Sequence, residues 1–261
     1  MTFAEKIKAA PAGQTHVFSV GQAGFIIKNS DGKLLGIDLC LSDYVEKLEG
    51  HVGFKRLLPK IFEPGELVLD VLVATHCHGD HYDYDAMPGL MDNDTTYLFA
   101  ACDCMEMVRE QKIEAQRVQF VKPGDTFRCA GFEISFVNCD HGKGAPLAVG
   151  VLVETDGKRI LEVGDTCLRT EFIPEYLQKG KLQVLIAPIN GMYGNLNEEE
   201  CAKLGDMLQP DILIPCHYGM YASHMGSLGK FYEIMTNRYA QNHFLLMTQG
   251  ERYTIENEKE G

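Results

Sequence analysis

Three histidines and an aspartate stand within six residues of one another, directly after an apolar run. The segment reads Thr75-His76-Cys77-His78-Gly79-Asp80-His81, and residues 71–74 before it are Val-Leu-Val-Ala. Histidine is the commonest metal-binding side chain, and a carboxylate suits a harder divalent cation. A solvated polar loop is the alternative interpretation. This density of ligand-type side chains at the end of a buried strand favours a metal site.

Three more ligand-type side chains follow other apolar runs of the chain. They are His141 after residues 133–138, Asp165 after residues 160–164, and His217 after residues 212–215. Any one of them alone would more often be an ordinary packed or surface residue. Together with the first segment they supply five histidines and two aspartates. That set is enough for two four- or five-coordinate cations that share a carboxylate.

Short runs of β-forming residues predict the strands that must position these side chains. Strands are predicted at residues 16–20, 24–28, 33–38, 67–75, 97–101, 118–121, 126–129, 133–138, 147–155, 159–164, 183–187 and 212–215, with hairpin turns at 29–32 and 156–157. Helices are predicted at residues 103–111, 197–208 and 227–238, with Asp103 and Asn197 as N-caps. Residues 42–64 are irregular, and we expect a loop or short helices that lie over another part of the molecule.

The ligand-type residues, in this order and spacing, resemble the signature of the metallo-β-lactamase superfamily. The resemblance covers residues 16–247. Within the superfamily, the chain is similar to the L-ascorbate-6-phosphate lactonase branch. The segments that carry this narrower similarity are Gly21-Gln22-Ala23-Gly24-Phe25, Ala187-Pro188-Ile189-Asn190-Gly191, Gly194-Asn195-Leu196-Asn197 and Pro215-Cys216-His217-Tyr218.

The resemblance implies an α/β (α+β) fold, a four-layer αββα sandwich with metals at one edge between the sheets. We expect a single domain over residues 1–261. The resemblance also implies one or two divalent cations, Mn²⁺ or Zn²⁺. By this resemblance, His76, His78 and His141 would hold the first cation, Asp80, His81 and His217 the second, and Asp165 would bridge them.

Such a centre would activate a water molecule for attack on a carbonyl carbon or on phosphorus. Asp80 is the internal candidate for orienting or deprotonating that water. The leading hypothesis is a lactonase that opens a lactone of a small polar substrate, sugar-derived and in some cases phosphorylated. One alternative is a phosphodiesterase that acts on RNA or a cyclic nucleotide, and another is a non-catalytic metal-binding protein.

Several polar residues follow the predicted strands on the side of the metals and are candidates for contact with substrate. His224, seven residues after His217, is a candidate catalytic proton donor, and its alternative is a merely exposed histidine. Asn195 and Asn197 have the alternative roles of forming a turn and capping a helix. The candidate substrate-binding residues are Asn190, Tyr193, Asn195, Asn197 and Tyr218.

Net charge and cysteine content indicate the kind of partner and the cellular compartment of the protein. The 261 residues include 24 Lys plus Arg against 37 Asp plus Glu, a net charge of −13, which argues against binding to nucleic acid. Nine cysteines without a CxxC pair, and no signal peptide, predict a cytoplasmic protein. No apolar stretch is long enough for a membrane span. We expect a small-molecule substrate, and by the resemblance a homo-oligomer.

Overall fold

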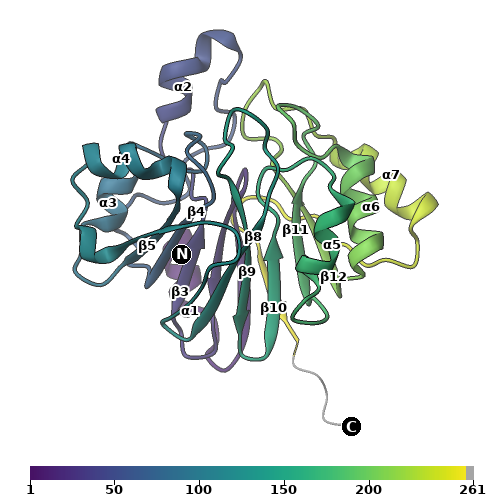
Figure 1. Ribbon diagram of the computed structural model, residues 1–261, viewed down its shortest axis with the longest axis horizontal. Helices are drawn as coiled ribbons and strands as arrows, with labels where there is room; N and C mark the ends of the chain where they lie inside the picture. Colours follow the sequence, from purple (N-terminus) through teal and green to yellow (C-terminus); the bar gives the residue numbers. More distant parts are fainter. Residues whose placement is uncertain (257–261) are drawn as a thin grey trace.

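Two β-sheets face each other at the centre of the molecule, and helices lie on their outer sides (Figure 1). The computed structural model describes residues 1–256, so residues 257–261 of the predicted single domain lie outside the described part. The layers follow one another as helix, sheet, sheet and helix. The predicted four-layer αββα sandwich of the α/β (α+β) class is therefore confirmed.

The first sheet has seven strands, in the order β13-β1-β2-β3-β4-β5-β6. Strands β13, β1, β2 and β3 pair antiparallel, and β3 to β6 pair parallel. The strands are β1 (Thr15–Gly21), β2 (Gly24–Lys28), β3 (Leu34–Ile37), β4 (Val71–Ala74), β5 (Tyr97–Ala101), β6 (Val118–Val121) and β13 (Arg252–Ile255).

The second sheet has six strands, in the order β12-β11-β10-β9-β8-β7. Strands β7 to β10 pair antiparallel, and β10, β11 and β12 pair parallel. The strands are β7 (Thr126–Cys129), β8 (Phe132–Asn138), β9 (Val149–Thr155), β10 (Lys158–Glu162), β11 (Val184–Pro188) and β12 (Ile212–Cys216).

Alternation of side chains along the second sheet builds two separate apolar cores. Val184 and Ile186 of β11 belong to the core between the two sheets, whereas Leu185 between them belongs to the core under the outer helices. Successive side chains of a strand point to opposite faces, so a strand covered on both sides is apolar throughout. This explains why β9, β11 and β12 read as nearly continuous apolar runs.

The helices are short and lie in two groups (Figure 1). Helices α1, α3 and α4 accompany the first sheet, and α5, α6 and α7 cover the second. Helix α2 projects beyond the upper ends of the sheets (Figure 1). The helices are α1 (Phe3–Ala9), α2 (Tyr44–Glu49), α3 (Met87–Met91), α4 (Met105–Glu110), α5 (Ile173–Tyr176), α6 (Glu198–Leu208) and α7 (Leu228–Arg238), with 3₁₀ turns η1 (Gly50–Val52), η2 (Cys102–Cys104), η3 (Ala115–Arg117) and η4 (Thr170–Phe172).

Several predicted boundaries and one predicted cap are wrong. The strands predicted at 147–155 and 159–164 are Val149–Thr155 and Lys158–Glu162. The strand predicted at 67–75 is paired only over Val71–Ala74, because Leu67 and Leu69 are buried without joining the ladder and the Asp70 carboxylate accepts from the Leu34 N–H at 2.9 Å. Asp103 does not cap a helix, because it lies inside the 3₁₀ turn that precedes α4. Within residues 1–256, no helix is both long and apolar enough to cross a membrane.

Candidate metal centre

The candidate ligands lie together at one end of the sandwich because each follows the end of a strand. The segment with His76, His78, Asp80 and His81 comes directly after β4, in the first sheet. The other three come from the second sheet. His141 follows β8, Asp165 follows β10 and His217 follows β12. The site therefore forms only when both sheets are assembled.

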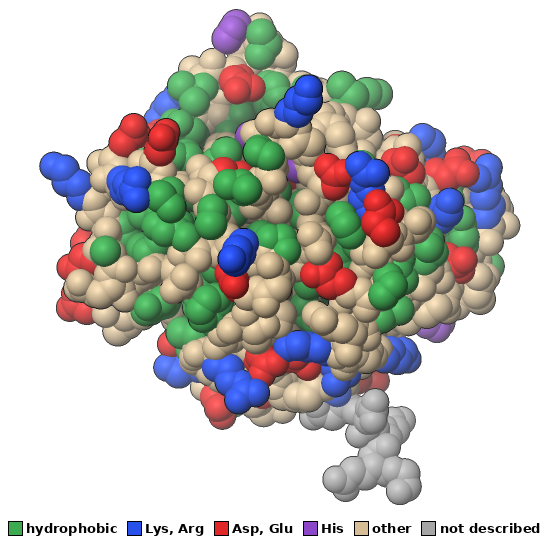
Figure 2. Space-filling model, in the orientation of Figure 1, with side chains coloured by type: hydrophobic (Ala, Val, Ile, Leu, Met, Phe, Trp, Pro, Cys, Tyr) green, Lys and Arg blue, Asp and Glu red, His purple; other side chains and the backbone are tan. Residues whose placement is uncertain are grey.

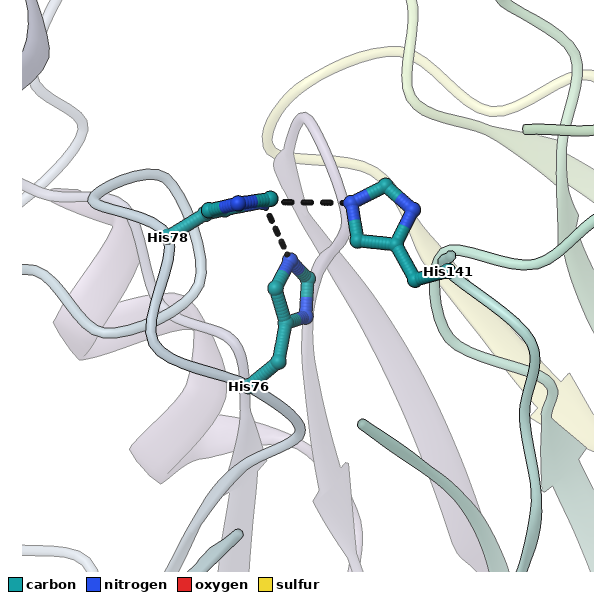
Figure 3. Close-up of side chains that lie close together, drawn as sticks. All are labelled: His76, His78 and His141. Carbon is teal, nitrogen blue, oxygen red and sulfur yellow. Dashed lines mark hydrogen bonds between the residues drawn. The ribbon is translucent and has the colours of Figure 1, made fainter. Parts of the chain in front are cut away.

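Three histidines form the first group of ligand atoms (Figure 3). The Nδ1 atom of His78 lies 3.0 Å from Nε2 of His76 and 3.1 Å from Nε2 of His141. A neutral imidazole has one N–H and one lone pair, so one ring nitrogen can make a single hydrogen bond at most. Three nitrogens that converge in this way match the arrangement of donors around a cation.

A second group combines two histidines with two carboxylates. The Nε2 atoms of His81 and His217 are 3.3 Å apart, and Asp80 Oδ2 lies 3.7 Å and 3.3 Å from them. Asp165 Oδ2 lies 3.4 Å from Nε2 of His81 and 3.1 Å from Nε2 of His217. The same oxygen is 3.7 Å from Nε2 of His141 in the first group. Asp165 thus stands between the two groups.

The pKa values of the buried histidines are shifted in opposite directions in the two groups. Burial, reinforced by the neighbouring His81, holds the pKa of His76 well below its ordinary value, and burial lowers the pKa of His141 to about 4. Burial opposes a charge on His217 as well, but Asp165 and Asp80 overcome it and raise the pKa to about 9. Without a cation the second group therefore holds protons, which metal binding must displace.

The ionised carboxylates of the second group are stabilised by the same pairing. Burial opposes ionisation of Asp165, but the charges of His217 and His81 hold its pKa well below the ordinary range. Asp80 behaves in the same way, with His81 and His217 as the compensating charges. Buried carboxylates that accept from histidines at these distances have the character of metal ligands.

Asp38 orients His81 from behind. Its Oδ2 atom lies 2.6 Å from Nδ1 of His81, and its two oxygens accept from the backbone N–H and the hydroxyl of Thr75 at 2.8 Å and 2.5 Å. Asp38 follows β3 and has a φ of 48°, a left-handed backbone that Asp and Asn adopt more readily than most residues. These contacts leave Nε2 of His81 free to face the centre.

Gln22 connects His224 to the second group. Its side-chain amide donates to Oδ2 of Asp80 at 2.8 Å and lies 2.6 Å from Nδ1 of His224. The backbone carbonyl of Gln22 also accepts from the backbone N–H of His217 at 2.8 Å. Asp80, His217 and His224 form a further set of atoms with ligand geometry. The connection between β1 and β2 thus contributes directly to the site.

A cavity of about 400 Å³ opens above the candidate ligands. Five of the seven line it, namely His78, Asp80, His141, Asp165 and His217, and His224 and Tyr193 line it as well. His76 and His81 are fully buried beneath them. Cys77 packs against the core between the sheets and also lines the cavity.

The remaining candidate substrate residues do not line the cavity in the described part of the chain. Asn197 caps α6 by accepting from the backbone N–H groups of Glu199 and Glu200, both at 3.0 Å. The Tyr218 hydroxyl donates to the Met247 carbonyl. The side-chain amides of Asn190 and Asn195 are buried and have no hydrogen-bond partner among residues 1–256, so they remain available to water or to a ligand.

Five apolar or aromatic residues that line the cavity were not predicted from the sequence. They are Tyr44, Val45, Leu48, Phe54 and Met107. The first four lie in the irregular segment 42–64, where apolar and aromatic side chains among charged residues were the available signal. Their position relative to the ligands depends on how that segment folds back, which no spacing in the sequence specifies.

Comparisons with known proteins give a family. The sequence model described as "Beta-lactamase superfamily domain" matches residues 48–218. A UPF0173 metal-dependent hydrolase of Polynucleobacter asymbioticus is 26% identical over 270 residues, covering 94% of this chain and 89% of that protein. A UPF0173 protein of Pyrococcus furiosus is 30% identical over 209 residues, covering 77% of this chain and 82% of that protein.

A solved structure agrees at the level of the fold. Igni18, described as a novel metallo hydrolase from Ignicoccus hospitalis, superposes with a TM-score of 0.73 at 20% identity. The match covers 94% of this chain and all of Igni18. At that identity the likeness concerns the arrangement of helices and strands alone.

Proposed function

The chain belongs to the metallo-β-lactamase superfamily, and from this premise we propose that it is a metal-dependent hydrolase. The observation that carries the proposal is the convergence of His78 Nδ1 on two further imidazole nitrogens at 3.0 Å and 3.1 Å. Hydrogen bonds alone do not account for three such nitrogens, whereas a cation among them does. The donor set of histidines and carboxylates fits Mn²⁺ or Zn²⁺.

We propose that two cation positions lie side by side and share one carboxylate. Asp165 is the shared ligand because its Oδ2 atom approaches histidines of both groups. Divalent cations held there would supply Lewis acidity, polarising a carbonyl oxygen and lowering the pKa of a water molecule. The proposed ligands are His76, His78 and His141 for one position, and Asp80, His81 and His217 for the other.

Asp80 and His224 are the proposed groups that handle protons. Asp80 stays ionised despite its burial because the charges of His81 and His217 hold its pKa low, so its carboxylate can accept a hydrogen bond from a water molecule and orient it. Burial and the nearby His217 lower the pKa of His224 to about 4, so its ring is neutral near pH 7. Because the Gln22 amide donates to Nδ1, the His224 proton resides on Nε2, where the neutral ring can donate a hydrogen bond to a leaving oxygen that takes its proton from water.

The proposed substrate is a lactone or a similar small ester. The cavity has the volume of a site for one small molecule. No Lys or Arg lines it in the described part of the chain, and the protein carries a net charge of −13. Both features disfavour RNA, the substrate of the alternative phosphodiesterase hypothesis, because RNA needs cations along its backbone.

The test compares substrate classes on protein loaded with Mn²⁺ or Zn²⁺. We expect hydrolysis of lactones that shows little dependence on salt, and negligible cleavage of single-stranded RNA or of a cyclic nucleotide. Efficient RNA cleavage that falls steeply with salt, together with inert lactones, would favour the phosphodiesterase. Bound metal without turnover of any of these substrates would favour the non-catalytic hypothesis.

A further inference from the structure

One side of the cavity is largely apolar, in contrast to its polar floor, although the Glu49 side chain also lines the cavity. We name the apolar wall by its residues Tyr44, Val45, Leu48, Phe54 and Met107, all of which line the cavity. Leu48 is 54% exposed, although it faces the site. Figure 2 shows hydrophobic side chains on the projection that carries α2. An exposed leucine beside candidate ligands is a surface that a bound molecule can cover.

The wall offers no partner for an anionic substituent. Lys47 and Lys55, on the same segment, pair with Asp85 and Glu46. The Arg56 guanidinium is buried and donates to the backbone carbonyls of Cys40, Ser42 and Leu58. A phosphate on this side of a substrate would therefore lose water without gaining a cation.

The wall is held in place before any ligand binds. The Arg56 hydrogen bonds tie the segment after α2 to the residues before it. Gly79 of the ligand loop has no side chain, and a Cβ there would lie 2.9 Å from the Tyr44 ring, so only glycine permits this approach of α2. The Phe54 ring meets the rings of His224 at 5.2 Å and Tyr193 at 5.8 Å between centroids. A preformed wall of this kind reduces the entropy lost on binding.

We propose that the apolar wall binds the alkyl or aryl substituent of an uncharged lactone or ester, whose carbonyl then lies on the polar floor. The inference rests on the proposed function. It names an uncharged lactone or ester with an apolar substituent as the substrate, in place of the phosphorylated sugar lactone expected from the sequence. A second copy of the chain covering α2 is the competing occupant, and the experiment distinguishes it.

The apolar wall predicts how the rate depends on the length of the substituent. Each methylene buried against the wall should raise kcat/KM about fourfold, because moving one CH₂ out of water is worth about 0.8 kcal/mol. Leu48→Ser and Phe54→Ala should each reduce the preference for a long substituent at least about fivefold. Leu57→Ser is the matched control, because Leu57 is 59% exposed and belongs to the same segment but does not line this cavity.

The experiment uses the full chain loaded with Mn²⁺ and three substrates: γ-valerolactone, γ-octalactone and glucono-δ-lactone 6-phosphate. Binding of 2-butylcyclopentanone, a ketone that cannot be hydrolysed, is measured alongside by calorimetry. We expect γ-octalactone to be preferred, and both its turnover and ketone binding to weaken in Leu48→Ser and Phe54→Ala but not in Leu57→Ser. Ketone binding with this pattern but no lactone turnover would refute the proposed lactonase activity while supporting the wall as a ligand site.

Three results would overturn the inference. The first is a preference for the 6-phosphate, and the second is a kcat/KM that does not change with substituent length; either would leave the hydrolase function intact. The third is a loss of self-association in Leu48→Ser, seen by sedimentation, without any change in ketone binding. That result would assign the exposed leucine to contact with a second copy.

Discussion

At the scale of single residues, Asp165 is the point where the two groups of candidate ligands meet. We predict that Asp165→Ala lowers bound metal and catalytic activity at least about 100-fold. Losing a residue that only orients a ligand costs about 10–100-fold, and losing a ligand common to both groups should cost more. Cys77→Ala should cost less than about tenfold, since Cys77 lines the cavity without being a proposed ligand. Elemental analysis and lactone turnover of both variants provide the check, and equal losses would contradict the bridging role.

Asp38 is proposed to act through His81 without touching a cation. Asp38→Asn should lower metal affinity by about 10–100-fold, because an amide orients the imidazole less strongly than a carboxylate. Asp156→Asn is the control: Asp156 also has a left-handed backbone, with φ of 51°, and its carboxylate accepts hydrogen bonds from Ser30 and Thr15. Competition titrations with a chelator measure both affinities. If the two variants bind metal equally well, Asp38 does not position His81.

At the scale of elements, Asn197 at the N-terminus of α6 can be tested as a helix cap against its alternative role as a substrate-binding residue. The side chain accepts from two backbone N–H groups, so Asn197→Ala should cost about 1 kcal/mol of unfolding free energy. Asn197→Asp, which keeps an accepting oxygen, should restore most of the loss. Urea denaturation measures both. A variant of unchanged stability but reduced kcat/KM would instead make Asn197 a substrate-binding residue.

An ion-pair cluster at β8 predicts a pH dependence of stability. Lys179 and Arg128 hold the pKa of Glu133 at about 2, below its ordinary value of 4.5. A depressed carboxyl pKa stabilises the folded state above pH 4.5, and that contribution is lost as the pH falls towards 2. Wild type should therefore exceed Glu133→Gln in denaturation midpoint at neutral pH, and the difference should shrink near pH 3. A difference that is constant with pH would contradict the pairing.

Strands were predicted well because both sheets bury continuous or alternating apolar residues. The turn at Asp156-Gly157, with φ of 51° and 70°, was predictable from its residue types alone. Helix α1 and strand β13 were not predicted, although the Thr2–Glu5 capping box was a signal for α1. That the seven candidate ligands lie together could be predicted because each follows the end of a strand. The apolar wall could not, since its residues reach the site only through the tertiary path of segment 42–64.

At the scale of the whole molecule, the two sheets and the ligand cluster depend on each other. Neither sheet holds a full set of ligands, so the site is complete only when the two sheets are packed together. A cation held by residues of both sheets would bind the folded state preferentially, so its removal should lower the midpoint of thermal unfolding. The expected homo-oligomer and the expected absence of nucleic-acid partners stay predictions, the latter consistent with a net charge of −13.

The central claim is that seven histidine and aspartate side chains hold divalent cations. The most direct measurement is elemental analysis of the folded protein after incubation with Mn²⁺ or Zn²⁺ and dialysis. We predict one or two bound cations per chain, and loss of most of them when His78 and Asp165 are replaced by alanine. A wild-type protein that retains neither metal under these conditions would contradict the proposed metal centre.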